Sequence, residues 1–221
     1  MERHLDQELT ELKTDLLKMA TMVESVIHSS VEALKKRDKE LANKVIADDE
    51  QIDELELVIE EKIVDLLALF QPLAGDLRFI AMAVHINGAL ERVADLAVNI
   101  SQRALELGDQ PLPKISVDIS HLGEQAQLMV KNVIDAFVHR DENLAKQVIL
   151  SDKESNRMRT DVIRELVRDH MTKDIKTASQ AVSLILATRD LERICDYAAS
   201  IAEDVIYIIQ AKVVKHHPER L

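Results

Sequence analysis

The sequence predicts an all-α protein of six long helices, arranged as two pseudo-symmetric three-helix bundles that arose by internal duplication. Composition gives the first reason, because 47% of the 221 residues are hydrophobic and 31% are charged, with only four Gly and four Pro. A chain rich in helix-forming residues and poor in helix breakers favours long helices over strands. Apolar residues at helical spacing and a repeat near the midpoint give the other two reasons. Aromatic residues make up 2% of the chain, so we expect an aliphatic core.

The first helix is predicted from apolar positions spaced alternately by four and three residues. The series, with a serine at one position, is Leu5, Leu9, Leu12, Leu16, Met19, Val23, Val26, Ser30 and Ala33. A second apolar set beside it widens the face, so the helix is expected to pack against at least two neighbours. An exposed coiled coil that pairs with another chain is the alternative.

Two further helices complete the first half. Asp38 follows a basic helix end and is expected to cap a second helix that runs to about Phe70. Pro72 and Gly75 interrupt the apolar pattern there. A third helix is predicted from about Asp76 to Leu107. The second half then repeats this order.

The repeat is visible residue by residue. Arg37-Asp38 matches Arg140-Asp141 at an offset of about 103, and residues 90–95 match residues 191–196 at an offset of about 101. A Gly- and Pro-rich stretch lies between the halves. We therefore predict a first three-helix repeat over 1–107, a linker over 108–114, a second three-helix repeat over 115–211, and a tail over 212–221.

Charge and cysteine content exclude several classes of protein. The formal net charge is −12, and an acidic surface repels phosphate backbones, so we expect no nucleic-acid partner. Cys195 is the only cysteine, which rules out an internal disulfide and fits a reducing compartment. The N-terminus lacks the apolar core of a secretion signal, and no apolar run approaches the length of a membrane span. We expect a cytoplasmic protein.

Paired carboxylates are the candidate functional groups. Glu91 and Asp95 lie four residues apart, so both project from one helix face, and Glu192 and Asp196 repeat the pair. The preceding helices carry the further candidates Asp49 and Asp53 in the first half, and Asp152 and Asn156 in the second. If the helices are antiparallel, each half brings these residues together. Grouped carboxylate oxygens suit Mg²⁺, Ca²⁺, Mn²⁺ or iron. The alternative is that they are ordinary solvated helix faces.

Other polar residues are assigned structural roles. Arg92 and Arg193 are expected to form salt bridges to neighbouring helices, and anion binding is the alternative. Cys195 aligns with an alanine of the first half, so a small buried residue is expected there rather than a nucleophile. Glu24 and His28 also lie four apart, and helix-surface pairing is the preferred interpretation over metal binding.

No enzymatic signature is found in the sequence. Its glycines are isolated, so there is no phosphate-binding glycine loop, and H-E-x-x-H is missing. The paired Glu-x-x-His motif of di-iron bundles is also missing, which disfavours a di-iron oxidoreductase. We predict a protein that is not an enzyme. A metal-free helical adaptor is the other alternative.

The duplicated acidic motif, the stretch Leu-Glu-Arg-Val-Ala-Asp-Leu-Ala-Val-Asn-Ile at 90–100 and the stretch Pro-Leu-Ala-Gly-Asp-Leu-Arg at 72–78 together resemble the PhoU family. The resemblance covers essentially the whole chain. It implies two three-helix bundles and a regulatory role with a phosphate ABC transporter and a membrane sensor histidine kinase, repressing phosphate-starvation genes when phosphate is plentiful. Contact with the membrane would then be only through these proteins, and a homodimer is an open alternative.

The resemblance also implies metal-binding acidic clusters, with Fe, Mn, Mg, Ca and Zn not distinguished. Carried over by position, the candidate ligands are Asp49, Asp53, Glu91, Asp95, Asp152, Glu192 and Asp196. Asn156 departs from the acidic pattern, so the second cluster is expected to bind metal more weakly.

Overall fold

The computed structural model describes residues 2–108, 119–171 and 177–215, and over these ranges it contains helices and no strand. The predicted all-α class is confirmed. The elements are α1 (Glu2–Lys36), α2 (Lys39–Phe70), α3 (Ala74–Leu107), α4 (Ile119–His139), α5 (Glu142–Leu166), the π-helical turn η1 (Val167–Met171) and α6 (Ala178–Gln210). Among the described residues, none of these helices is long and apolar enough to cross a membrane.

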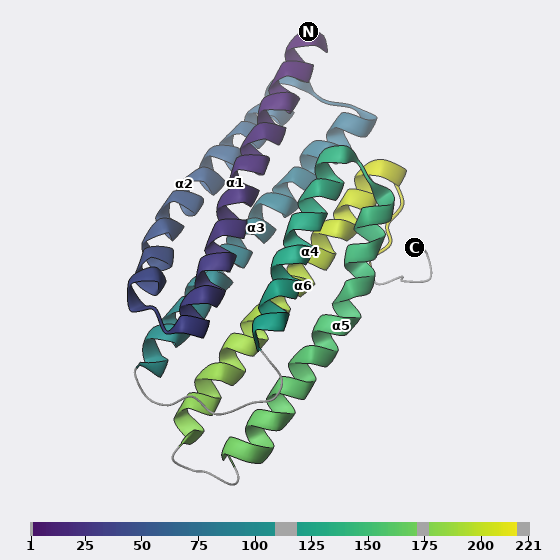
Figure 1. Ribbon diagram of the computed structural model, residues 1–221. Helices are drawn as coiled ribbons and strands as arrows, with labels where there is room; N and C mark the ends of the chain where they lie inside the picture. Colours follow the sequence, from purple (N-terminus) through teal and green to yellow (C-terminus); the bar gives the residue numbers. More distant parts are fainter. Residues whose placement is uncertain (1, 109–118, 172–176, 216–221) are drawn as a thin grey trace.

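The helices form two layers (Figure 1). One layer has four helices in the order α2, α3, α6, α5, each packed on the next. In the other layer, α1 packs on α2 and α3, α4 packs on α5 and α6, and α1 and α4 touch. Each half is thus a three-helix bundle, and the central pair α3 and α6 joins the halves.

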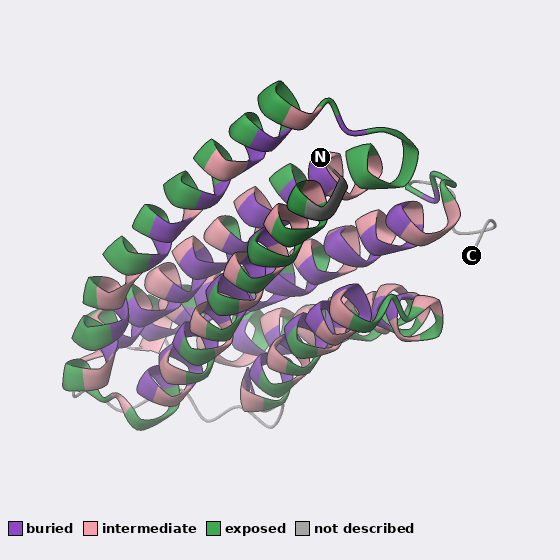
Figure 2. Cartoon of the chain, turned by 90° about the horizontal axis from the view of Figure 1, so that it is seen from above, coloured by how far each residue is buried: buried purple, intermediate pink, exposed green. Residues whose placement is uncertain are grey.

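The broad apolar face of α1 is buried within the chain. Leu12, Met19, Val23 and Ile27 are fully buried in contact with the common core. The alternative of an exposed coiled coil is therefore wrong, because α1 already has three neighbours, α2, α3 and α4. Figure 2 shows the resulting division, with buried residues on the inner side of the helices and exposed residues outside.

The turns between the first two helices of each half repeat the same geometry. Asp38 caps α2 by accepting hydrogen bonds from the backbone amides of Glu40 and Leu41, both at 3.0 Å. Asp141 caps α5 in the same way, at 2.9 and 3.1 Å. The preceding residues Arg37 and Arg140 both have left-handed backbones, with φ of 55° and 51°. The predicted cap at Asp38 is confirmed.

The limits of the third helix agree closely with the prediction. α3 begins at Ala74, two residues before the expected Asp76, and ends at Leu107 as expected, with Gly108 in a positive-φ conformation. Residues 109–114 of the predicted linker and 216–221 of the predicted tail lie outside the described residues. The predicted domain limits stay a prediction.

Candidate metal site

The first carboxylate cluster lies on the outer groove between α2 and α3. The two helices are antiparallel, and the side-chain amide of Asn87 donates to the backbone carbonyl of Glu56 at 3.0 Å, which places these two residues at the same level. From that level, Asp49 and Asp53 lie opposite Asp95 and Glu91. The predicted antiparallel arrangement of α2 and α3 is confirmed.

Burial and mutual repulsion act together on these carboxylates. Burial, followed by the charges of Asp53 and Asp95, raises the pKa of Asp49 to about 6. Burial also raises the pKa of Glu91 to about 7, with Asp95 the next cause. Arg92 opposes this rise, while Glu56 and Asp53 add to it. Acids of both helices therefore share one electrostatic environment, which disfavours having all of them charged at once.

Glu56 is a fifth member of the cluster that the sequence interpretation missed. Its pKa is raised by burial, and then by Glu60 and Asp53. It follows Asp53 by three residues and Asp49 by seven, so ordinary helical spacing puts it on the same stripe. That spacing is the signal in the sequence that marks Glu56 as a member of the cluster.

Arg92 balances the first cluster from its outer edge. Its Nε lies 3.3 Å from Oε2 of Glu91, and its Nη1 lies 3.2 Å from Oδ2 of Asp95. Both partners are on α3 itself, so the prediction that Arg92 pairs with a neighbouring helix is wrong. The side chain is 59% exposed, so solvent screens this countercharge.

The second cluster combines residues of α5 and α6 at equivalent positions. Burial, then Glu192 and Asp152, raises the pKa of Asp196 to about 6. The side-chain amide of Asn156 donates to Oδ2 of Asp152 at 3.0 Å. The other carboxylate oxygen of Asp152 is buried and has no hydrogen-bond partner. The structure thus brings these four residues together, as the repeat predicts.

A guanidinium replaces the fifth carboxylate in the second half. At the repeat offset of about 103, Glu56 corresponds to Arg159, and Nη1 of Arg159 lies 3.3 Å from Oε1 of Glu192. The paired Glu192 side chain is only 11% exposed. Because this ion pair spans α5 and α6, the second cluster has a countercharge that links its two helices, whereas the ion pairs of Arg92 in the first cluster stay within α3.

The two clusters therefore differ as metal sites. Five carboxylates suit a hard cation, which would relieve their repulsion. In the described part of the chain, however, no three His, Cys, Asp or Glu side chains are gathered closely enough to hold a metal ion as they stand. Binding at the first cluster would need rotamer changes. Glu91 and Asp95 would have to leave the exposed Arg92 at the first cluster, and Glu192 would have to leave the less exposed Arg159 at the second, so the second cluster fits a cation less well.

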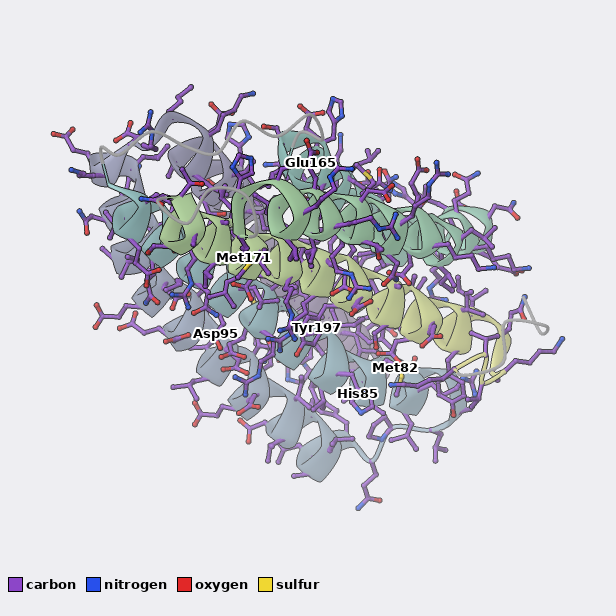
Figure 3. All side chains as sticks on the ribbon, turned by 90° about the horizontal axis from the view of Figure 1, so that it is seen from below. Met82, His85, Asp95, Glu165, Met171 and Tyr197 are labelled. Atoms are coloured by element: carbon purple, nitrogen blue, oxygen red, sulfur yellow. The ribbon has the colours of Figure 1, made fainter. Side chains whose placement is uncertain are left out.

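Both clusters open onto the same face of the molecule. Figure 3 shows Asp95 and His85 of α3 beside Tyr197 of α6 on the face of the four-helix layer. In the groove between α3 and α6, His85 Nδ1 lies 3.8 Å from Oδ2 of Asp204. Burial raises the pKa of Asp204 to about 6, against the opposing charge of His85.

The structure also shows the surroundings of Cys195 and of the pair Glu24 and His28. Cys195 is fully buried, and burial raises the pKa of its thiol to about 12, so the expectation of a small buried residue is confirmed. Glu24 and His28 line a groove of about 370 Å³ between α1 and α4 together with Glu124 and Lys131. Burial and the charge of Asp135 raise the pKa of Glu24.

The sequence matches a known family model twice. The model described as the PhoU domain matches residues 16–104 and again residues 119–205, which together cover both halves of the fold. The chain belongs to the PhoU family. The two matches also coincide with the two three-helix bundles, so the duplication read from the sequence is the family's own.

Relatives of this PhoU-family chain match over nearly its whole length. A phosphate-specific transport system accessory protein PhoU homolog of Pseudomonas putida is 38% identical over 97% of this chain and 84% of its own length. The homolog of Aquifex aeolicus is 38% identical over 96% of each chain. These PhoU relatives are named as accessory proteins of a transport system.

Solved PhoU structures superpose closely. The crystal structure of PhoU from Pseudomonas aeruginosa has a TM-score of 0.91 at 38% identity and covers 94% of this chain and 99% of that one. The phosphate transport system regulatory protein PhoU from Streptococcus pneumoniae has a TM-score of 0.88 at 26% identity, over 95% and 99%. The two-bundle architecture is thus the PhoU architecture.

Proposed function

We propose that this chain regulates phosphate uptake as an accessory protein of a phosphate ABC transporter, and that it conveys the transporter's state to a sensor histidine kinase. The observation that carries the proposal is the match, over nearly the whole chain, to relatives named as phosphate-specific transport system accessory proteins. Both partners are membrane proteins, so the proposed site of action is their cytoplasmic surface.

In this proposal the chain acts by binding rather than by catalysis. Among the described residues, the two clusters are made of carboxylates, one amide and their paired guanidinium groups, and the thiol of Cys195 beside the second cluster is buried. The proposed outcome of signalling is repression of phosphate-starvation genes when phosphate is plentiful.

A metal ion at the first cluster belongs to the same proposal. Its ligands would come from Asp49, Asp53, Glu56, Glu91 and Asp95. Burial, with repulsion from neighbouring carboxylates, raises the pKa of Asp49, Glu56 and Glu91, and a cation would relieve that repulsion. Asp152, Glu192 and Asp196 would bind more weakly, because Asn156 and Arg159 already satisfy two of them. A metal bridging α2 and α3 would stiffen the first bundle.

Deletion of the gene tests the regulatory role. In a verified deletion strain grown with ample phosphate, transcripts for phosphate uptake should rise to levels otherwise seen in starvation, and the wild-type gene should restore repression. Unchanged transcripts would contradict the proposal. Complementation with the double variant Glu91→Ala, Asp95→Ala tests whether repression needs a metal ion at the first cluster. Full repression by that variant would favour the metal-free adaptor.

A further inference from the structure

The α2–α3 groove carries exposed apolar side chains beyond its carboxylates. They are well exposed for their size: Leu57 62%, Val64 62%, Leu67 38%, Leu77 43% and Val84 41%. With Glu56 and Asn87 at one level, the antiparallel register brings the α2 members beside the α3 members. Contiguous exposed apolar surface of this kind marks interaction sites rather than ordinary solvent faces.

These apolar residues continue the same helical stripes as the carboxylates. On α2 the positions follow at steps of three or four, in the order Asp49, Asp53, Glu56, Glu60, Val64, Leu67. On α3 the positions follow at steps of three, four or seven, in the order Leu77, Val84, Gly88, Glu91, Asp95. We call these two stripes the α2–α3 seam. The seam is apolar at the end near the α2–α3 turn and acidic at the other end.

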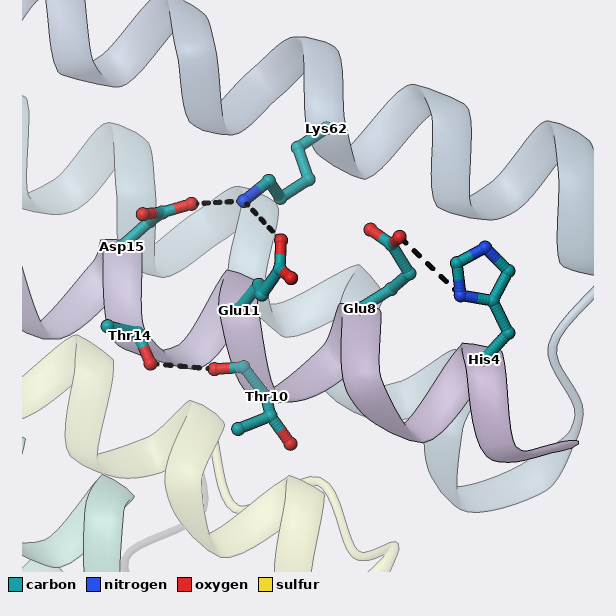
Figure 4. A network of polar contacts seen from close by, with 7 residues as sticks. All are labelled: His4, Glu8, Thr10, Glu11, Thr14, Asp15 and Lys62. Carbon is teal, nitrogen blue, oxygen red and sulfur yellow. Dashed lines mark hydrogen bonds and ion pairs between the residues drawn. The ribbon is translucent and has the colours of Figure 1, made fainter.

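Lys62, the one basic residue in the acidic part of α2, does not neutralise the acidic residues of the seam. Residues 48–65 contain nine acids and one base, Lys62. Lys62 faces α1, where its ammonium pairs with Asp15 and lies 3.7 Å from Oε2 of Glu11 (Figure 4). The exposed side of α2 is therefore a strongly negative surface directly beside an apolar one.

Gly88 lies between the apolar and acidic ends of the seam. A glycine inside a helix costs roughly 1 kcal/mol relative to alanine. Packing does not require it here, because a β-carbon at Gly88 would meet nothing within 4 Å. What the missing side chain does provide is room for another backbone to approach α3 closely.

The second half does not repeat the seam. At the repeat offsets, Leu67 becomes His170 and Leu77 becomes Ala178, so two of the four apolar members of the seam are lost. Glu56 becomes Arg159 and Gly88 becomes Arg189, which place positive charge at the corresponding groove. The combination is thus a property of the first half alone and not of the duplicated scaffold.

We propose that the α2–α3 seam docks one amphipathic helix of a partner protein, with apolar side chains on one stripe and Lys or Arg clustered at one end. An amphipathic helix can lay its apolar face in a groove of this kind, and complementary charge fixes its direction. A second copy of this chain fits less well, since it would bring like charges together. The inference concerns the chemistry of the partner segment and does not rest on the proposed role in phosphate uptake.

The test uses the full chain and fluorescent synthetic helices of about five turns. Two peptides carry Leu at helical spacing, with Lys and Arg at either the N-terminal or the C-terminal end, and a scrambled peptide of equal composition is the control. Fluorescence anisotropy should show binding of one basic-ended peptide with a dissociation constant below about 100 µM, weakening as salt rises. The scrambled peptide should bind at least about tenfold more weakly.

Variants locate the binding. The double change Val64→Ser, Val84→Ser should weaken binding about tenfold or more, whereas Leu150→Ser, at an exposed α5 position, should leave it within about twofold. Gly88→Gln should also weaken binding while leaving the melting temperature unchanged or raised, a pairing that a misfolded variant would not give. Circular dichroism checks the fold of each variant.

Three results would overturn the proposal. The first is that neither basic-ended peptide binds. The second is that the scrambled peptide binds equally well. The third is that binding is unchanged in the double variant Val64→Ser, Val84→Ser and also in Gly88→Gln. Sedimentation equilibrium of the chain alone tests whether a second copy of this chain occupies the seam. If the chain self-associates and Val64→Ser, Val84→Ser abolishes it, the seam is a self-interface and the partner-helix proposal is wrong.

Discussion

Glu56 and Arg159 show how one residue changes the chemistry of a duplicated site. Both lie at the same position of their repeat, yet Glu56 adds to the repulsion in the first cluster and Arg159 pairs with Glu192 in the second. The first cluster therefore holds five carboxylates whose repulsion an ion could relieve, and the second holds three, one of them paired with Arg159. Removing a carboxylate should have opposite effects in the two halves.

We expect Glu91→Gln to stabilise the metal-free protein. A carboxyl group whose folded-state pKa is raised, here to about 7 from 4.5, favours the folded state at low pH. That advantage disappears as the pH rises from about 4.5 to 7, so the gain from Gln should grow over this window and stay constant above it. Thermal melts with chelator should show a rise of a few degrees at pH 8, at roughly 2–4 °C per kcal/mol, and little change at pH 4.5.

Glu192→Gln is the matched control for that change. It removes the partner of Arg159 and leaves a half-buried guanidinium without its ion pair, so the melting temperature at pH 8 should fall. If both substitutions shift the melt in the same direction, the two clusters are equivalent and the electrostatic distinction is incorrect.

Much of the site could be predicted at the residue scale. Helical spacing together with the internal repeat and the family resemblance identified the carboxylates on α2, α3, α5 and α6 that the structure brings together. The same spacing would have found Glu56 and Arg159. Burial of one Asp152 oxygen and the pairing of Arg92 within its own helix depend on side-chain rotamers, which no sequence pattern specifies.

At the scale of elements, glycines and caps set how closely helices approach and where they begin. A β-carbon at Gly123 of α4 would lie 2.7 Å from Cγ1 of Val31 on α1, so the contact of these helices needs glycine there. The sequence predicted the helices and the Asp38 cap because those signals are local. The π-helical turn at Val167–Met171 was not predicted, because no local residue pattern marks it.

Two glycine substitutions should have opposite effects on stability. Gly123→Ala should cost about 1–3 kcal/mol by overpacking against Val31, and Val31→Ala in that background should recover part of the loss. Gly88→Ala should gain about 0.5–1 kcal/mol, since its surroundings are open. Urea unfolding measures both, and a loss from Gly88→Ala equal to that from Gly123→Ala would refute the packing argument.

The two equivalent caps should contribute equally. Asp38→Ala and Asp141→Ala each remove a side chain that accepts from two backbone amides, and each should cost about 1 kcal/mol. Asp→Asn at either position should restore most of the loss, because asparagine also caps. Urea denaturation midpoints distinguish these outcomes, and an Asn variant as unstable as the Ala variant would argue against capping.

At the scale of the whole molecule, the duplication predicts two bundles but not their arrangement. The two bundles lie side by side because α3 and α6 each bury a broad face. Part of that face packs within the helix's own bundle, and part packs against the other of these two helices. The repeat could not show this, because an interface between halves has no counterpart within either half. The result places both carboxylate clusters on one face of the four-helix layer.

The joint core predicts cooperative unfolding. Because α3 packs on α6 and α1 on α4, neither bundle can unfold without exposing apolar surface of the other. Scanning calorimetry should therefore give one transition, with calorimetric and van't Hoff enthalpies that agree. Two resolved transitions would show that the halves are thermodynamically independent.

The central claim is that the first cluster is the stronger cation site because it lacks the arginine of the second. Calorimetric titration of Mn²⁺ into the wild type, Glu56→Arg and Arg159→Glu tests it most directly. The wild type should show one stronger site, Glu56→Arg should weaken that site about tenfold or more, and Arg159→Glu should strengthen binding at the second cluster. A wild type that neither binds nor is stabilised by Mn²⁺, Fe³⁺, Mg²⁺, Ca²⁺ or Zn²⁺, or a Glu56→Arg variant with unchanged affinity, would contradict the account.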